Sequence, residues 1–212
     1  MEEAHEELLN VYDAAGSVVG ALPRREAKAS GLAVGAVNVL LVNAAGEVLL
    51  QRRPLDKENG GRWDKTVGGH VGAGEGFDET AVREAGEELL DDASSPLVRL
   101  AAGEDVYREI EDRATHGIVF RRVGLRLGLR DVRVGPDGGV RTVLYHVAIY
   151  RGRTDLPLEA FRPQASEIDE LRYFLPAAVD RMLLDGALSP NMAFLWLTEG
   201  HALVSGGEPG AR

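Results

Sequence analysis

The stretch GGHVGAGEGFDETAVREAGEELL, residues 68–90, decides the fold of this 212-residue chain. Its first half is rich in glycine, so the backbone there can turn tightly and bring its own N–H and C=O groups close to a ligand. From Phe77 onwards, apolar residues recur at helical spacing, which predicts an amphipathic helix with its N-cap at Gly76. The stretch therefore predicts a loop that runs directly into a helix packed on a core.

Three glutamates, Glu84, Glu87 and Glu88, occupy a different face of the predicted helix from its apolar residues. Like charges four residues apart destabilise a helix slightly. A bound Mg²⁺ ion would remove this repulsion, because Mg²⁺ prefers carboxylate oxygens and keeps water molecules for a phosphate substrate. A solvated acidic face is the simpler alternative. The glycine-rich loop ahead of the glutamates, and Arg83 among them, favour the metal site.

The loop and helix together resemble the signature of a known family. Gly69, Glu75 and the run Arg83-Glu-Ala-Gly-Glu-Glu match the Nudix box, Gly-x5-Glu-x7-Arg-Glu-U-x-Glu-Glu-x-Gly-U, where U is aliphatic. Two terminal positions differ, because Leu90 stands where the family has Gly and Asp91 where it has an aliphatic residue. Gly commonly caps a helix C-terminus, so the difference concerns the end of the helix and not the chemistry.

The resemblance implies a Nudix-type α/β/α sandwich with a mixed sheet, which is an α+β fold. It also implies a set of metal ligands: Glu84, Glu87, Glu88 and the carbonyl oxygen of Gly68. Glu84 and Arg83 would act in catalysis as well. Arg83 would also pair with Glu75 and hold the loop against the helix. The alternative for Arg83 is a surface cation beside Glu87.

A wider resemblance extends over most of residues 8–175. The motifs Gln51-Arg52-Arg53, Trp63-Asp64 and Gln164-Ala-Ser-Glu-Ile resemble the branch of Nudix proteins related to isopentenyl diphosphate isomerase. The isomerase has Cys-Gly-His where this chain has Gly68-Gly69-His70. The chain contains no cysteine at all, so it lacks the thiol of that enzyme.

Four further residues are candidates for the site. Glu167 lies in a loop before a predicted strand, where the family often supplies another carboxylate as metal ligand or base; a solvated loop glutamate is the alternative. Arg52 and Arg53 alternate across a strand, so one of them can face the pocket and hold a phosphate. The alternative is that both arginines lie at a solvated strand end and bind no phosphate. Trp63 is an aromatic residue able to stack on a base. Tyr107 lies at about the spacing where dinucleoside polyphosphate hydrolases of the family carry a Tyr, but packing in the core or at its rim is the favoured interpretation.

Composition excludes several classes of protein. Hydrophobic residues make up 44% and charged residues 27% of the chain, as in ordinary globular proteins. The net charge of −10 argues against binding to nucleic acid or to an anionic membrane. No apolar run approaches the ~18 residues of a membrane-spanning helix. We therefore expect a cytoplasmic protein with one domain over residues 1–204 and a disordered tail over 205–212. The sequence leaves open whether the chain forms a homodimer.

Strand and helix patterns complete the expected α+β fold, with an extra N-terminal hairpin and C-terminal helices. Residues 8–22 predict the hairpin and residues 23–30 a short helix. Strands are expected at 35–42, 47–53, 63–67, 97–106, 118–129, 140–150 and 171–175. Helices are expected at 176–185 and from Pro190 to about Glu199.

The function favoured by these features is hydrolysis of a diphosphate linkage in a nucleoside diphosphate derivative or a related organic diphosphate. Mg²⁺ would be the cofactor, with Mn²⁺ as a substitute. Two alternatives stay open: an enzyme like isopentenyl diphosphate isomerase, and a catalytically silent Nudix module that binds a nucleotide. Few aromatic residues are available to stack on a base, so we expect modest base selectivity.

Overall fold

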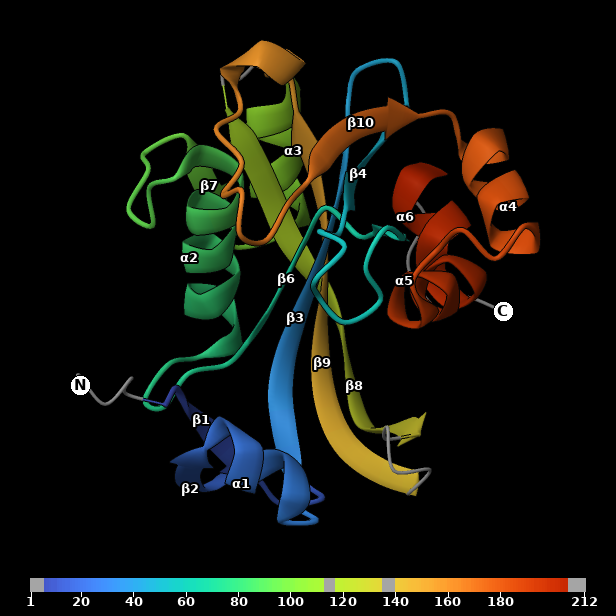
Figure 1. The fold of residues 1–212 in the computed structure, drawn as a ribbon. Coiled ribbons are helices and arrows are strands. Elements are labelled where there is room, and N and C mark those ends of the chain that lie inside the picture. Colours follow the sequence, from blue (N-terminus) through green and yellow to red (C-terminus); the bar gives the residue numbers. More distant parts are fainter. Residues whose placement is uncertain (1–5, 113–116, 135–139, 206–212) are drawn as a thin grey trace.

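One mixed β-sheet carries the fold, and helices cover both of its faces (Figure 1). The computed structural model describes residues 6–112, 117–134 and 140–205; residues 206–212 of the expected tail lie outside this part. The elements follow in the order β1 (Leu8–Tyr12), β2 (Val18–Pro23), α1 (Arg24–Ala29), β3 (Ala33–Val42), β4 (Val48–Arg52), β5 (Trp63–Asp64), β6 (Val67–His70), α2 (Phe77–Leu90), β7 (Val98–Leu100), α3 (Glu104–Asp112), β8 (Ile118–Val134), β9 (Val140–Thr154), η1 (Leu158–Ala160), β10 (Glu170–Phe174), α4 (Pro176–Leu184), α5 (Pro190–Leu195), η2 (Trp196–Gly200) and α6 (His201–Ser205).

Strand β3 is the centre of the sheet. The main path runs β10-β4-β3-β9-β8-β7, with β3 and β9 parallel and with β5 and β6 added beside β4 and β3. The predicted N-terminal hairpin is confirmed as β1 and β2, which pair in antiparallel fashion. A mixed sheet with segregated helices is an α+β architecture. The expected fold class is therefore confirmed.

Alternation along β3 sends side chains into two separate cores. Val37 and Val39 face the core under helix α2, whereas Val34 and Leu40 face the core under the C-terminal helices. In Figure 1, helix α2 lies on one side of the sheet and helices α4, α5 and α6 on the other. Helix α2 can therefore hold its buried face on the sheet and aim its glutamates along the sheet surface.

Helix α2 ends without the glycine that the family has at position 90, and the backbone at Asp91 and Gly86 makes this ending possible. Asp91 adopts the left-handed conformation, with φ 53°, which Asp tolerates better than most side chains. The following residue, Asp92, donates its N–H to the carbonyl of Gly86 at 3.0 Å. A Cβ atom at Gly86 would lie 2.3 Å from the carbonyl oxygen of Asp92. Gly86 therefore permits the close return of the chain.

Two expected strands differ in the structure. The strand predicted over 97–106 ends at Leu100, and residues from Glu104 onwards form helix α3. Glu104 and Asp105 lie in its first turn, where the helix dipole favours negative charge. Tyr107 is buried on this helix, so its predicted core role is confirmed. The strand predicted over 63–67 divides into β5 and β6 because β5 pairs with β4 whereas β6 pairs with β3.

The C-terminal helices are fastened to strand β5. Ser189 is the N-cap of helix α5, and its hydroxyl accepts a hydrogen bond from the Met192 N–H. Trp63 donates its N–H to Ala187 O at 3.0 Å, and Ser189 donates its N–H to Trp63 O at 2.8 Å. None of the helices in the described ranges is both long and apolar enough to cross a membrane.

Candidate active site

The glycine-rich loop is tied to helix α2 by a two-point ion pair. Arg83 donates from Nε to Glu75 Oε1 at 2.7 Å and from Nη2 to Glu75 Oε2 at 3.0 Å. Thr80 donates its hydroxyl to Glu75 as well. The hydrogen bond from Arg83 is the largest cause that lowers the pKa of Glu75, and the same bond raises the pKa of Arg83. The structure thus brings the predicted loop–helix pair together.

Glu84 lies directly on the backbone of strand β6. A Cβ atom at Gly69 would stand 2.1 Å from Glu84 Oε1, so only glycine leaves room for the carboxylate there. Burial raises the pKa of Glu84, and the charge of Arg83, whose Nη2 is 3.1 Å away, partly opposes this effect. Glu84 is therefore a largely buried carboxylate held at the point where loop and strand meet.

Glu88 lies one helical turn further on and is more deeply buried. Its Oε2 accepts hydrogen bonds from Gln51 Nε2 at 3.3 Å and from the Gly68 N–H at 3.4 Å. Burial, followed by the charge of Glu84, raises the pKa of Glu88 to about 8. The N–H and C=O of one strand residue point to the same side of the strand. The carbonyl of Gly68 therefore points to the side on which Glu88 lies.

Glu87 stands apart from the other two glutamates. Its side chain is 39% exposed and bonds to Arg83 Nη1 at 2.8 Å. Arg83 is thus in ion contact with Glu75, Glu84 and Glu87 together.

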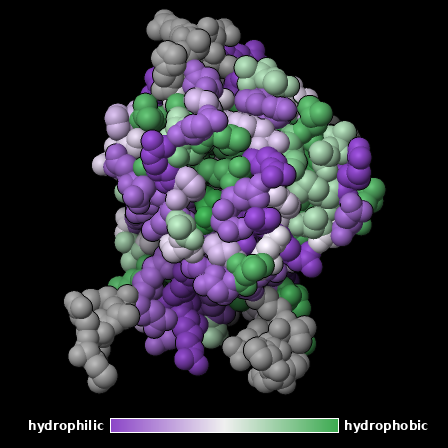
Figure 2. Space-filling model, turned by 45° about the horizontal axis from the view of Figure 1, so that its top comes forward, coloured by the Kyte–Doolittle hydropathy of each residue, from purple (hydrophilic) through white to green (hydrophobic). Residues whose placement is uncertain are grey.

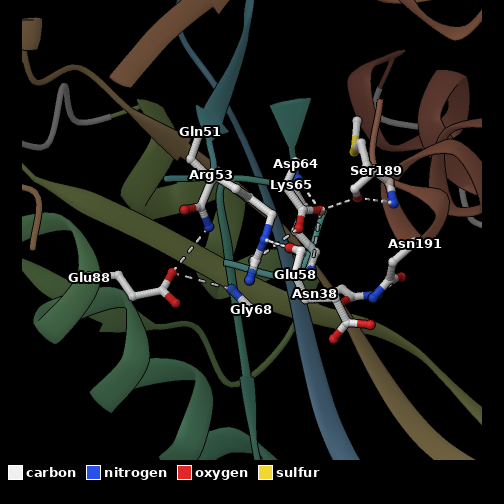
Figure 3. A network of polar contacts seen from close by, with 11 residues as sticks. Asn38, Gln51, Arg53, Glu58, Asp64, Lys65, Gly68, Glu88, Ser189 and Asn191 are labelled. Atoms are coloured by element: carbon white, nitrogen blue, oxygen red, sulfur yellow. Dashed lines mark hydrogen bonds and ion pairs between the residues drawn. The ribbon is translucent and has the colours of Figure 1, made fainter. Parts of the chain in front are cut away.

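Arg52 and Arg53 point to opposite faces of the sheet. Arg53 shares the face of Gln51 and donates to Glu58 O at 2.8 Å and to Asp64 Oδ2 at 3.4 Å (Figure 3). Arg52 instead pairs with Asp169 at 2.8 Å and lies over the ring of Trp63. Arg53 is therefore the arginine on the side of the glutamates.

Trp63 shares the face of Arg52. Its ring packs edge-on against Phe174, with 4.7 Å between the ring centroids, in the core under the C-terminal helices. This position separates Trp63 and Arg52 from Glu84 and Glu88. The predicted stacking of a base on Trp63 has no support from this placement, and substrate binding by either residue stays a prediction.

Glu167 reaches the site through its loop. The loop docks on the end of helix α2, because Arg162 and Gln164 donate N–H groups to the carbonyls of Leu89 and Glu88 at 2.8 and 3.0 Å. The charge of Glu167 adds to the rise in the pKa of Glu88. Its own carboxylate bonds to Lys57 Nζ at 2.7 Å. The structure therefore places Glu167 near Glu88, with Lys57 as its present partner.

A buried polar network, shown in Figure 3, was missed in the sequence. Asp64 Oδ1 accepts hydrogen bonds from the Ser189 hydroxyl and the Lys65 N–H, both at 2.9 Å. Burial acts to raise the pKa of Asp64, but the charge of Lys65 and the Ser189 hydrogen bond outweigh it, so the pKa is lowered. Lys65 Nζ lies 3.4 Å from the same oxygen. The only signal was an Asp-Lys pair placed next to apolar strand residues.

The chemistry of the donor atoms suits a hard divalent cation such as Mg²⁺. Glu84, Glu87, Glu88 and the Gly68 carbonyl all offer oxygen, which Mg²⁺ prefers. Gln51 Oε1, beside Glu88, is buried and has no hydrogen-bond partner among the described residues. As the side chains stand, no three His, Asp or Glu residues within the described ranges form a group that could hold a metal. Glu84 and Glu87 are bound to Arg83 instead.

Comparison with known proteins identifies the family. Residues 33–193, more than half of the chain, match the model of the NUDIX domain, and the chain therefore belongs to the Nudix family. It is 43% identical over 84 residues to an uncharacterized Nudix hydrolase from Pseudomonas aeruginosa, which is 39% of this chain and 50% of that protein. The chain spans about half the length of the curated relatives it matches.

Two further comparisons concern the branch and the fold. The chain is 33% identical over 107 residues to an isopentenyl-diphosphate Delta-isomerase from Paenarthrobacter aurescens, over 50% of this chain and 57% of that protein. The crystal structure of DR0079 from Deinococcus radiodurans matches with a TM-score of 0.62 at 22% identity, over 89% of this chain and 96% of that chain. This structural likeness shows the fold.

Proposed function

We propose that the chain is a Mg²⁺-dependent hydrolase that cleaves the diphosphate linkage of a nucleoside diphosphate derivative or a related organic diphosphate, with Mn²⁺ as a substitute for Mg²⁺. One observation carries the proposal: Glu84 and Glu88 meet on strand β6 beside a loop that the Arg83–Glu75 pair fixes. Nudix proteins generally use a divalent metal, and the oxygen donors at this position suit one.

The proposal gives each of these residues a role. Glu84, Glu87, Glu88 and the Gly68 carbonyl would hold the metal. When bound, the metal stabilises charge on the phosphoryl oxygens and lowers the pKa of a coordinated water. A carboxylate at the site, Glu84 or Glu167, accepts the proton of the attacking water. The new P–O bond forms as the bond between the two phosphates breaks.

Arg53 is proposed to bind the substrate phosphates. It lies on the glutamate face, and its planar guanidinium can donate to two phosphate oxygens at once. Since Trp63 lies on the other face, recognition would depend on the diphosphate more than on a base. A solved structure with a similar fold contains a nucleoside diphosphate derivative. The NUDIX domain of Shewanella oneidensis NrtR, seen in complex with ADP ribose, matches with a TM-score of 0.50 at 14% identity, over 81% of this chain and 88% of that chain.

Phosphate release tests the proposal. Pooled nucleoside diphosphate derivatives are incubated with the enzyme and Mg²⁺ or Mn²⁺. Alkaline phosphatase then frees phosphate from the two phosphate monoester products but not from the intact diphosphate diester, and this phosphate is measured by colour. Glu84→Gln and Glu88→Gln should each lower kcat by about a hundredfold or more while circular dichroism stays native. Glu79→Gln is the matched control, because Glu79 lies on the same helix and, among the described residues, bonds to the loop N–H of Gly76 and to none of the site residues. Unchanged rates in both site variants would contradict the proposal.

Substrate preference is measured with the same assay. Purine and pyrimidine derivatives should differ in kcat/KM by less than about a hundredfold, which corresponds to about 2.7 kcal/mol in transition-state energy. A larger preference for one base would show that a base pocket exists. Silence toward every compound with both metals would favour the alternative of a binding module.

Isomerisation of isopentenyl diphosphate is the second candidate. The two relatives named as isomerases favour it. It needs an acid and a base on opposite faces of an alkene, and the chain has no cysteine to supply a thiol. Deuterium incorporation into dimethylallyl diphosphate during incubation in deuterated water would establish isomerisation.

Homodimer formation and a cytoplasmic location stay predictions. Apolar surface gathers at the right of Figure 2, with hydrophilic residues at its edge, on the side where Figure 1 shows the C-terminal helices. Leu184 and Leu197 are 84% and 70% exposed there and could pack against a second copy. Light scattering on the eluting protein tests the dimer, and cell fractionation tests the location.

A further inference from the structure

Lys65 is a buried cation in the short connection between strands β5 and β6. Its side chain is only 8% exposed. Lysine is almost never fully buried unless it is paired. The side chain runs across Gly68, where a Cβ atom would lie 2.1 Å from Lys65 Cε and 2.7 Å from Nζ. The glycine at position 68 is therefore what allows the ammonium to reach this position.

Asp64 alone does not account for the burial of this ammonium. Asp64 already accepts a hydrogen bond from Ser189 and lies 3.4 Å from the guanidinium of Arg53, a second cation. Glu88, by contrast, forms no ion pair with any residue in the described ranges. Its carboxylate accepts from Gly68 N–H, the residue over which Lys65 lies. The charge of Lys65 opposes the rise in the pKa of Glu88 that burial and the charge of Glu84 cause.

We propose that Lys65 is a resident cation beside the proposed metal site, whose ammonium supplies part of the positive charge that Glu88 requires and thereby weakens the binding of divalent ions. The inference rests on the proposed function, because it concerns the same carboxylates. Gly68 has two roles in it: its missing side chain admits the ammonium, and its carbonyl is an expected metal ligand. Lys65 is thus a positioning residue that sets how much free metal the enzyme needs.

The direction of the effect follows from charge. Removing the ammonium lets either a proton or a metal bind the carboxylates more tightly. The divalent ion carries twice the charge of a proton, so the repulsion removed is larger for the metal. Replacing Lys65 by a neutral side chain should therefore strengthen metal binding even where protons compete.

The test measures Mn²⁺ binding to the full chain, without substrate, by the loss of the free-ion electron paramagnetic resonance signal. Lys65→Met should lower the Mn²⁺ Kd by about tenfold. Lys28→Met is the matched control, since Lys28 lies in the last turn of helix α1 and not on the loop or helix that carries the glutamates; its Kd should stay close to the wild-type value. Lys65→Gln repeats the measurement with a polar side chain in case Lys65→Met does not fold.

An unchanged or higher Kd in the folded Lys65 variant would overturn the inference. The result is independent of turnover, because no substrate is present. Failure of the proposed function would appear instead as a wild-type protein that releases no phosphate from any diphosphate. The two failures are therefore distinguishable.

Discussion

Arg83 and Glu75 are joined by two contacts, Nε to Oε1 at 2.7 Å and Nη2 to Oε2 at 3.0 Å, which tie the glycine-rich loop to helix α2. Glu75→Gln removes the charge from this pair. The free energy of unfolding should fall by about 1 kcal/mol, because a charge-assisted hydrogen bond is lost. Urea denaturation measures this change. The rate of phosphate release should fall as well, since the loop no longer holds β6 against the glutamates. Equal denaturation midpoints and equal rates would show that the pair is dispensable.

Glu88 makes the stability of the metal-free protein depend on pH. Its pKa is about 8 in the folded chain, against an ordinary value of 4.5. Between these two values the unfolded chain releases the proton that the folded chain keeps, so stability falls as pH rises. Glu88→Gln removes this penalty. In EDTA, the variant should exceed the wild type in Tm by about 3 °C or more at pH 8.

At pH 4.5, the ordinary pKa of a glutamate, the difference in Tm between Glu88→Gln and the wild type should be small. At that pH the folded and the unfolded wild-type chain differ little in the number of protons they bind. Added Mg²⁺ should raise the Tm of the wild type more than that of the variant, because only the wild type carries the full carboxylate set. A Tm difference that does not change with pH would contradict the burial of an ionisable Glu88.

Gly69 should tolerate no side chain without loss of activity. In Gly69→Ala the new Cβ would meet Glu84 Oε1 at 2.1 Å, so the carboxylate must leave strand β6. The expected result is a drop in kcat of at least about tenfold with a native circular dichroism spectrum. Gly124→Ala is the control, because a Cβ there meets no atom within 4 Å. Equal activity of the two variants would show that Glu84 does not need its present position.

Arg53 and Arg52 form a natural pair for comparison. Arg53→Ala should raise the KM for a diphosphate substrate by about tenfold, because its guanidinium lies on the face of the glutamates. Arg52→Ala should leave KM unchanged, because Arg52 pairs with Asp169 and Glu170 on the other face. Steady-state kinetics measures both values. The reverse order of effects would move the phosphate site to the opposite face of the sheet.

The parts of the site that lie close together in the sequence could be predicted from it. The spacing of Glu75 and Arg83, and the helical spacing of Glu84 and Glu88, place these residues within one loop and one helix. Gln51 and Lys65 could not be found in this way. Gln51 reaches Glu88, and Lys65 comes to lie over Gly68, only because β4 and β6 both lie beside the central strand β3, and no local pattern reports which strands are neighbours.

Strand and helix boundaries failed for the same reason. Residues 97–106 contain enough apolar residues for a strand, but only Val98, Arg99 and Leu100 find partners in β8. Beyond Gly103 none of the described strands pairs with this segment, and Tyr107 is buried from a helix instead. Likewise, alternation showed that Arg52 and Arg53 face opposite ways, but only the packing of the C-terminal helices decides which face is which.

The hydrogen bond between Asp64 and Ser189 joins residues 125 positions apart. During synthesis the ribosome releases strand β5 long before it has made the start of helix α5. Until then Asp64, together with the Lys65 beside it, lacks the hydroxyl that completes its burial. The order of translation therefore makes the buried pair of Asp64 and Lys65 one of the last parts of the nascent chain to mature, although the Nudix signature is finished before residue 92.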